Sequence, residues 1–334
     1  MMKKILQKII GKNQYLNLAQ LNLMRSNYYR DFILYRKYST VLGLNSFENK
    51  EAAIILDYHS IEKGFLFNEM KPSFAKQKVT RLHRLLHDPQ IQEKANQSQI
   101  KVAYQVMCRY YEVHQENNYS LGFYSKEDYD FYKKILAKNY DDSFTGIIDY
   151  GKEQFYNSTE KNFEEFANSR KSIRNFTGEK VNSELIFKAI QLSATAPSVC
   201  NRQASKVYLV EDKIKIDKLL QIQGGMTGYT EDISQLLILT NDRRYYYTVG
   251  ERNQLYIDGG IFLMNLLYSL HFYKIAACPA NWGKNIQEEA SLHGIIDLAE
   301  SEKIICMIPI GIAEDNFKVC LSKRREASEI LSLI

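Results

Sequence analysis

Cations and a hydroxyl alternate in one short segment in the second half of the chain. Arg170, Ser172 and Arg174 stand at every second position, and Lys171 adds a further cation. In an extended segment alternate side chains point to the same side, so these three would converge on one face. Guanidinium groups bind phosphate oxygens through paired hydrogen bonds, and a serine hydroxyl adds a neutral one. The segment therefore predicts a phosphate site, although a solvated basic stretch before a turn has the same composition.

A turn rich in short polar side chains follows this segment. Pro197 ends a helical pattern, and Ser198, Asn201 and Gln203 come directly after it. Asn and Gln each carry a donor and an acceptor, so they can hydrogen-bond the polar edge of a flat heterocycle. Ordinary turns are rich in the same residue types. Taken alone, the turn is compatible with a ligand contact or with a plain chain reversal.

Two further elements could complete a binding site. Cys278 begins a tight loop whose small residues would let backbone N–H groups approach a ring closely; the loop continues with Pro279, Ala280, Asn281 and Trp282. No CxxC partner or nearby histidine activates Cys278, and we interpret it as a packed residue. Near the C-terminus, Lys323 and Arg325 belong to a basic cluster. Such a cluster could supply further cations to the phosphate site, or it could be a solvent-exposed tail.

The elements that must position these residues fall into two regions. Residues 15 to about 140 show apolar positions at three- and four-residue spacing, which predicts helices. We interpret residues 141–168 as a linker. Beyond it helices and strands interleave, which favours an α+β domain. Strands are predicted at 206–210, 235–240 and 303–311, and helices at 183–195, with Ser183 as N-cap, and at 258–272. The predicted domains are 1–150, helical, and 163–330.

Composition excludes several classes of protein. Hydrophobic residues at 45% and charged residues at 25% are typical of a soluble globular chain. The net charge of +5 is mild and the cations are interspersed with acids, so no nucleic-acid partner is expected. Five scattered cysteines without CxxC spacing argue against disulfides or a zinc site and favour a reducing cytoplasm.

The first ten residues carry lysines and a short apolar run that Gln7 and Lys8 interrupt. The run is too short for a signal sequence or a membrane span. As a helix it could touch a membrane surface, but docking onto the protein's own body is the favoured interpretation. Membrane contact is therefore not expected.

The order and spacing of the four elements resemble the nitroreductase-like FMN-dependent flavoproteins. That family begins with Arg-x-Ser-x-Arg/Lys-x-Phe, continues with Pro-Ser-x-x-Asn-x-Gln, and then has a central helix that starts with Asp and small residues. A Cys/Pro/Gly loop and a basic element after a glycine turn complete the pattern. Here the counterparts are Arg170–Phe176, Pro197–Gln203, Asp258–Trp282 and Gly311–Arg325. The resemblance covers about residues 163–330, roughly half of the chain.

The resemblance implies a mainly antiparallel central sheet flanked by helices, in an obligate homodimer with FMN at the subunit interface. Hydride would pass from NAD(P)H to the flavin and then to a small-molecule acceptor. By position in the family pattern, Arg170, Lys171, Ser172 and Arg174 with Lys323 and Arg325 would hold the phosphate and ring edge. Pro197, Ser198 and Asn201 would come from the partner subunit, and Pro279, Ala280, Asn281 and Trp282 would line a face of the ring. Gln203, in the same turn as Asn201, is also expected to bind the cofactor.

Two features depart from the family pattern. The mid-domain Asn that contacts the flavin has no clear counterpart, and Gln223 or Thr227 could replace it. The helical N-terminal domain is an addition of unknown role, giving a long form of the fold. Within it, Asp57–Gly64 resembles a segment of longer nitroreductase-like proteins encoded beside polysaccharide-biosynthesis genes. Its His59 could contact a substrate or donate a proton, or could belong to a buried network at a helix end closed by Gly64.

The predicted function is therefore an FMN-dependent oxidoreductase that passes electrons from NAD(P)H to an acceptor such as a nitro compound, a quinone or a polysaccharide-pathway substrate. One alternative is a catalytically silent flavin-binding scaffold or storage module. Another is a transferase whose basic clusters bind a sugar nucleotide, although no phosphate-binding glycine loop supports it. No catalytic side chain is required by the flavin chemistry, and no metal is predicted.

Overall fold

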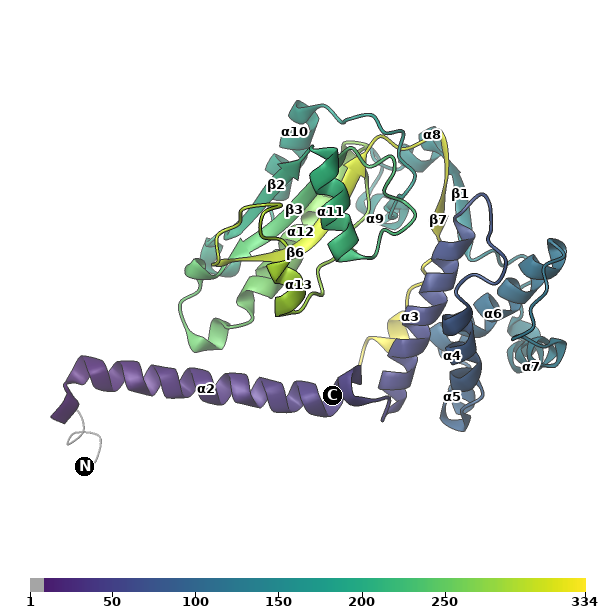
Figure 1. Cartoon of the computed structure of the whole chain (residues 1–334), viewed down its shortest axis with the longest axis horizontal. Helices are drawn as coiled ribbons and strands as arrows, with labels where there is room; N and C mark the ends of the chain where they lie inside the picture. The colour runs from purple at the N-terminus through teal and green to yellow at the C-terminus, as the bar shows by residue number, and fades with distance from the viewer. Residues whose placement is uncertain (1–8) are drawn as a thin grey trace. The chain divides into compact units, whose positions relative to one another are not determined.

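The computed structural model describes residues 9–334, and the chain divides into two compact units (Figure 1). The N-terminal unit runs to Ile148 and includes Cys320–Ile334, and the C-terminal unit is Asp149–Val319. The predicted second domain extended to residue 330, so its last segment groups with the N-terminal unit instead. Most of the apolar run predicted at 1–10 lies outside the described residues.

The N-terminal unit is helical. Its helices are α2 (Lys12–Tyr38), η1 (Thr40–Leu42), α3 (Phe47–Phe65), α4 (Lys76–Leu86), α5 (Pro89–Glu93), α6 (Ser98–Glu116), α7 (Lys126–Leu136), η2 (Ala137–Asn139) and η6 (Ala327–Glu329). One apolar core joins α3, α4, α6 and α7, with Ile54, Leu82 and Val106 fully buried. Helix α3 continues through Gly64, where an added Cβ would lie 2.0 Å from a ring atom of Phe74. That glycine therefore allows close packing inside the helix, and the prediction that it closes the helix is wrong.

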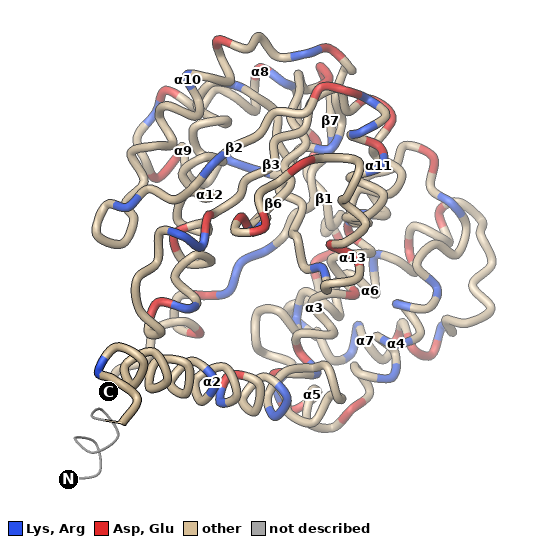
Figure 2. The backbone as a smooth tube through the Cα atoms, turned by 60° about the vertical axis from the view of Figure 1, so that its left-hand side comes forward, with Lys and Arg blue, Asp and Glu red and all other residues tan. Residues whose placement is uncertain are grey.

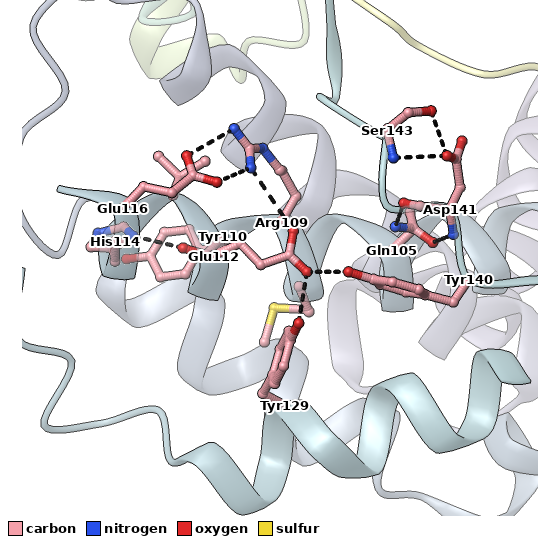
Figure 3. A network of polar contacts seen from close by, with 12 residues as sticks. Gln105, Arg109, Tyr110, Glu112, His114, Glu116, Tyr129, Tyr140, Asp141 and Ser143 are labelled. Carbon is pink, nitrogen blue, oxygen red and sulfur yellow. Dashed lines mark hydrogen bonds and ion pairs between the residues drawn. The ribbon is translucent and has the colours of Figure 1, made fainter. Parts of the chain in front are cut away.

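A polar network fixes α6 against the chain that follows it (Figure 3). Glu112 accepts hydrogen bonds from the hydroxyl groups of Tyr129, at 2.9 Å, and Tyr140, at 2.5 Å. Burial and the neighbouring carboxylate raise the pKa of Tyr140 to about 12, so it stays a donor at neutral pH. On the same helix Gln105 exchanges two hydrogen bonds with the backbone of Asp141. These contacts attach α6 to α7 and to the chain that follows it.

Helix α2 has no buried residue within the described part of the chain. Large apolar side chains such as Leu18, Leu21, Tyr29 and Phe32 are each more than half exposed. At 100° per residue these four side chains lie within about 80° of one another, whereas the exposed Leu16, Leu23 and Leu34 lie on the opposite side, so α2 presents apolar side chains on two sides.

The C-terminal unit contains an antiparallel sheet, which confirms the predicted α+β fold. The strand order is β2 (Ser205–Val210), β3 (Gln235–Asp242), β6 (Glu302–Gly311) and β4 (Ala276–Ala277), and β5 (Ala280–Asn281) also pairs with β6. A second sheet pairs β1 (Ile147–Gly151) with β7 (Asn316–Cys320). Every residue of β3 is buried, as expected for a central strand. Lys and Arg are interspersed with Asp and Glu along the chain (Figure 2).

The helices of this unit are α8 (Lys152–Tyr156), α9 (Phe163–Ser169), α10 (Ser183–Ser193), α11 (Lys213–Gln223), α12 (Gln254–Phe272) and α13 (Ile286–Ala290), with short turns η3 (Val199–Asn201), η4 (Arg243–Tyr245) and η5 (Val249–Glu251). The predicted linker 141–168 is therefore largely structured, because β1, α8 and α9 occupy it. The N-cap of α10 is Asn182, whose side chain accepts from Glu184, and not Ser183 as predicted.

Helix α12 packs on one face of the sheet together with α10. Its Leu266 and Leu270 share a core with Ile186 of α10 and with Leu237 and Ile308 of the strands. At Gly259 an added Cβ would lie 2.7 Å from a side-chain carbon of Ile305. Glycine at this position therefore allows the start of the helix to pack closely against the sheet. This close approach fixes the start of α12, which carries part of the candidate site.

Candidate functional site

The cation segment 170–176 is held along the edge of the C-terminal unit. The backbone N–H of Ile173 donates to Ala277 at 3.1 Å, and Phe176 forms an isolated bridge with Ala313. Both Ile173 and Phe176 are buried, which anchors the backbone on either side of Arg174. The backbone is extended at Arg170, as predicted.

A buried histidine lies beside the start of this segment. His271, in the last turn of α12, lies 2.7 Å through Nε2 from the hydroxyl of Ser169. Burial, aided by the positive charges of Arg170 and Lys171, lowers the pKa of His271 to about 4. His271 is therefore neutral at neutral pH and adds no positive charge there. Sequence analysis did not identify it, because an apolar helix with one terminal histidine gives no distinctive signal.

The turn 197–203 is constrained from within. The Ser198 hydroxyl accepts from the backbone of Gln203 at 3.0 Å, and the Gln203 side chain donates to Asn201 Oδ1 at 3.0 Å. Cys200, Asn201 and Gln203 all have a left-handed backbone, with φ between 47° and 54°. Such conformations cost about 1–3 kcal/mol each and gather at functional sites. The three predicted polar residues therefore lie together in one strained turn.

Two residues that sequence analysis missed hold this turn in place. The Asp258 carboxylate accepts the Val199 N–H at 3.3 Å and the Gln254 side chain at 2.9 Å. Arg202 makes a bidentate pair with Glu251, at 2.7 and 3.0 Å, which lowers the pKa of that carboxyl to about 2. Asp258 had been noted only as the start of a helix. No sequence pattern indicates the ion pair of Arg202, because its partner Glu251 lies far along the chain.

The loop after β4, which was predicted to line a face of the flavin ring, makes several contacts within the protein. Ala280 and Asn281 form β5 against β6, so their backbone is part of the sheet. Trp282 is buried and donates from Nε1 to Glu289 of α13 at 2.9 Å. Gln223 donates to the Asn281 carbonyl at 2.9 Å. Its Oε1 accepts from Gly225 at 2.6 Å, so both ends of this candidate flavin contact are used within the protein.

The polar turn and the start of the cation segment contact opposite ends of α12. Asp258 receives the turn 197–203, and His271 receives the start of the cation segment. These two positions are about 20 Å apart along a helix that rises 1.5 Å per residue. The turn and the start of the cation segment of one chain therefore do not meet at one point.

The C-terminal cations belong to the N-terminal unit. Arg325 makes a bidentate ion pair with Glu51 of α3, at 2.7 and 3.0 Å, and Glu51 is buried. The carbonyl of Lys323 accepts from Gln99 at 3.3 Å, which fixes the backbone and leaves the side chain out of that contact. The role of Lys323 and Arg325 in phosphate binding stays a prediction, with Arg325 already engaged by a carboxylate.

His59 lies on α3 beside a buried acid. Its Nδ1 is 3.1 Å from Glu62 Oε2, and the Glu62 side chain is fully buried whereas that of His59 is 38% exposed. The helical spacing predicted from the sequence is therefore present. A carboxylate behind an imidazole fixes the orientation of its ring, a requirement for a histidine that transfers protons.

A family model matches the part of the chain that contains the cation segment and the turn 197–203. Residues 167–227 match the family model described as the nitroreductase family. Iodotyrosine deiodinase from Hydra vulgaris is 22% identical over 195 residues, which cover 49% of this chain and 70% of that protein.

Solved structures give similarities of the same extent. A nitroreductase family protein from Clostridium difficile 630 is 20% identical with a TM-score of 0.42, over 51% of this chain and 97% of that one. A protein from Desulfovibrio desulfuricans, solved in complex with FMN, is 20% identical with a TM-score of 0.43, over 52% and 96%. The predicted resemblance is confirmed by the family match: residues 167–227 of this chain carry the sequence pattern of the nitroreductase family.

Proposed function

We propose that this protein is an FMN-dependent oxidoreductase that takes electrons from NAD(P)H and passes them to a small-molecule acceptor. The observation that carries the proposal is the family match at residues 167–227, which contains both the cation segment and the polar turn. None of the five cysteines, all of which lie among the described residues, forms a disulfide, in keeping with a reducing cytoplasm. No helix among the described residues is long and apolar enough to cross a bilayer.

The residues of the cation segment fit a phosphorylated cofactor. Asn175 Oδ1 is buried and has no hydrogen-bond partner among the described residues, as expected for an acceptor that a ligand hydroxyl or N–H would satisfy. Beside it, Arg170 and Arg174 supply charge and Ser172 a hydroxyl. These side chains would hold the FMN phosphate, with Lys323 as a further cation. Bound FMN would supply the hydride chemistry, so no general acid or base is required.

The same geometry supports a homodimer with the cofactor between subunits. The turn and the start of the cation segment lie at opposite ends of α12, so one end of FMN could contact a cation segment and another end a partner's turn. Ile257, Ile261 and Met264 form an exposed apolar stripe on α12. Next to them an added Cβ at Gly260 would meet open space, which leaves room for a second helix to approach closely.

Replacing Ile257 and Ile261 together with glutamate should give a folded monomer that retains little FMN. Buried like charges at a symmetric interface would oppose association, and the partner's turn would be lost with it. Light scattering after size exclusion gives the mass, and the absorbance ratio gives the flavin content. Ile214→Glu, on the exposed side of α11, is the matched control and should stay dimeric. A dimeric double variant with full flavin content would contradict this interface.

For His59 we propose contact with the acceptor, oriented by Glu62. The pair provides a partly exposed imidazole with a fixed ring, and a proton delivered to the acceptor would accompany electron transfer. His59→Ala should then lower turnover without changing flavin content. Loss of flavin in this variant would mean that the histidine supports the cofactor site instead.

The visible absorption spectrum of the purified protein tests the proposed function directly. We expect the two bands of oxidised flavin, and we expect them to bleach when NADPH or NADH is added without oxygen. Flavin bands that resist both donors would favour the silent binding module. A colourless protein that gains no flavin from added FMN would refute the proposal and favour the transferase alternative.

A further inference from the structure

Three potential metal ligands meet in the N-terminal unit. His59 and Glu62 are three residues apart on α3, so their side chains share one face of the helix. Cys320, at the end of β7, brings a thiol to the same place. One ligand atom from each of the three lies within 4.8 Å of the other two. These residues come from segments more than 250 positions apart, and only the fold unites them.

Glu62 carries a buried carboxylate oxygen that no group of the described residues satisfies. Its side chain is fully buried, and its Oε2 is 3.1 Å from His59 Nδ1. Its Oε1 is also buried and has no hydrogen-bond partner among the described residues. A buried carboxylate is normally fully hydrogen-bonded, paired with a cation or bound to a metal, because an uncompensated charge is costly. The orphan oxygen belongs to the carboxylate that faces His59 and Cys320.

We propose that His59, Glu62 and Cys320 bind a divalent transition metal, with Zn²⁺ as the best match. Imidazole nitrogen, carboxylate oxygen and thiolate sulfur are the three ligand types of protein zinc sites. Three protein ligands leave a fourth position of the tetrahedron open, and the partly exposed His59 places it within reach of solvent. The absence of CxxC spacing excludes only zinc sites built from closely spaced cysteines. It does not exclude a site made of a His-x-x-Glu pair and one distant thiol.

A second group, His83, His87 and Asp128, also brings ligand atoms within 4.8 Å of one another. Two contacts inside the protein already use this group: His83 Nδ1 is 2.6 Å from the Tyr132 hydroxyl, and His87 Nε2 is 3.0 Å from Asp128. His83 Nε2 is buried without a hydrogen-bond partner among the described residues, but burial lowers the pKa of this imidazole to about 4, so it leaves no uncompensated charge. Asp128 also accepts from the Ser125 hydroxyl at 2.9 Å. This group contains no thiol, so it serves as an internal control for a metal site defined by Cys320.

The proposed metal would fasten the C-terminal segment to α3. Several contacts already attach this segment: Arg325 pairs with Glu51, the Ser98 hydroxyl donates to Glu329, and Gln99 donates to the Lys323 carbonyl. A ligand that binds only the folded protein raises stability in proportion to the logarithm of its concentration above Kd. Zn²⁺ should therefore raise the melting temperature of the full-length protein, and a chelator should lower it.

The test uses the whole protein, with its flavin if present, after dialysis against a chelator and then against buffer. Co²⁺ and Zn²⁺ are titrated separately, with calorimetry for stoichiometry and absorption for the Co²⁺ complex. We expect one ion per chain, a thiolate-to-Co²⁺ charge-transfer band, and d–d bands at longer wavelengths than oxidised flavin absorbs. These readouts do not depend on turnover or on flavin, so they remain informative if the proposed oxidoreductase function fails.

Variants identify the ligands. Cys320→Ser should remove the charge-transfer band. Loss of an outer-shell partner lowers metal affinity by about 10- to 100-fold, and Glu62→Gln, which removes a direct ligand, should weaken binding by more than that. His59→Ala, at a partly exposed position, gives the same test if the buried variants fail to fold. Cys200→Ser, with an exposed thiol, and His87→Ala should bind as the wild type does. Lack of stoichiometric binding, or binding that survives Cys320→Ser and disappears in His87→Ala, would overturn the proposal.

Discussion

Replacing Arg170 and Lys323 together with alanine is expected to abolish retention of FMN while the protein stays folded. A hydrogen bond to a charged partner contributes about 1.5–3 kcal/mol, so the loss of two corresponds to roughly 10²- to 10⁴-fold weaker binding. Flavin content after gel filtration and a fluorescence titration with FMN measure the effect. Circular dichroism establishes that the fold is kept.

The matched control removes two positive charges elsewhere. Lys180→Ala with Arg324→Ala changes the net charge by the same amount, because it also removes two cations. Lys180 pairs with Glu211 and Arg324 donates to the neighbouring Ser322 carbonyl, and neither is assigned to the phosphate site. This control should keep its flavin. If the Arg170/Lys323 double variant kept its flavin as well, the assignment of the phosphate site would be wrong, whichever reaction the protein catalyses.

Acidification from pH 6.5 to pH 5 should destabilise the C-terminal unit, and His271 should account for much of the effect. Burial lowers the pKa of His271 to about 4 in the folded protein, whereas an unfolded histidine titrates near 6.5. The unfolded chain therefore takes up a proton first, and stability falls as the pH falls from 6.5 towards 4. Below about pH 4 both states are protonated and this loss stops. Over the window to pH 5 the loss is about 2 kcal/mol.

Denaturant unfolding at pH 6.5 and at pH 5 measures this loss, above the range in which carboxylates titrate. His271→Gln removes the ionisable group and keeps a nitrogen near Ser169, so the difference between the two pH values should shrink by most of that amount. His293→Gln, at an exposed position, should leave the difference unchanged. An unaltered pH dependence in His271→Gln would show that the imidazole is not held neutral by the fold. His83, whose pKa burial also lowers to about 4, should act in the same way in the N-terminal unit.

The fold class followed from the sequence because periodicity is a local property. The apolar spacing before residue 140 predicted helices, and the buried runs that became β2, β3 and β6 predicted strands. Boundaries were less exact: the capping residue of α10 is Asn182, and α12 begins at Gln254, ahead of the predicted Asp258. The segment 141–168 is polar, and a polar composition does not exclude short elements such as β1 and α9.

The candidate site divides in the same way. The segments that carry ligand-binding residue types could be predicted from residue order, because the pattern from Arg170 to Gln203 is continuous along the chain. Three arrangements are visible only in the folded chain: Asp258 and Arg202 brace the polar turn, Arg325 pairs with Glu51, and Cys320 lies beside His59 and Glu62. They join residues that are far apart in the chain. Their energies depend on burial and on distances of a few ångströms, which local residue spacing does not encode.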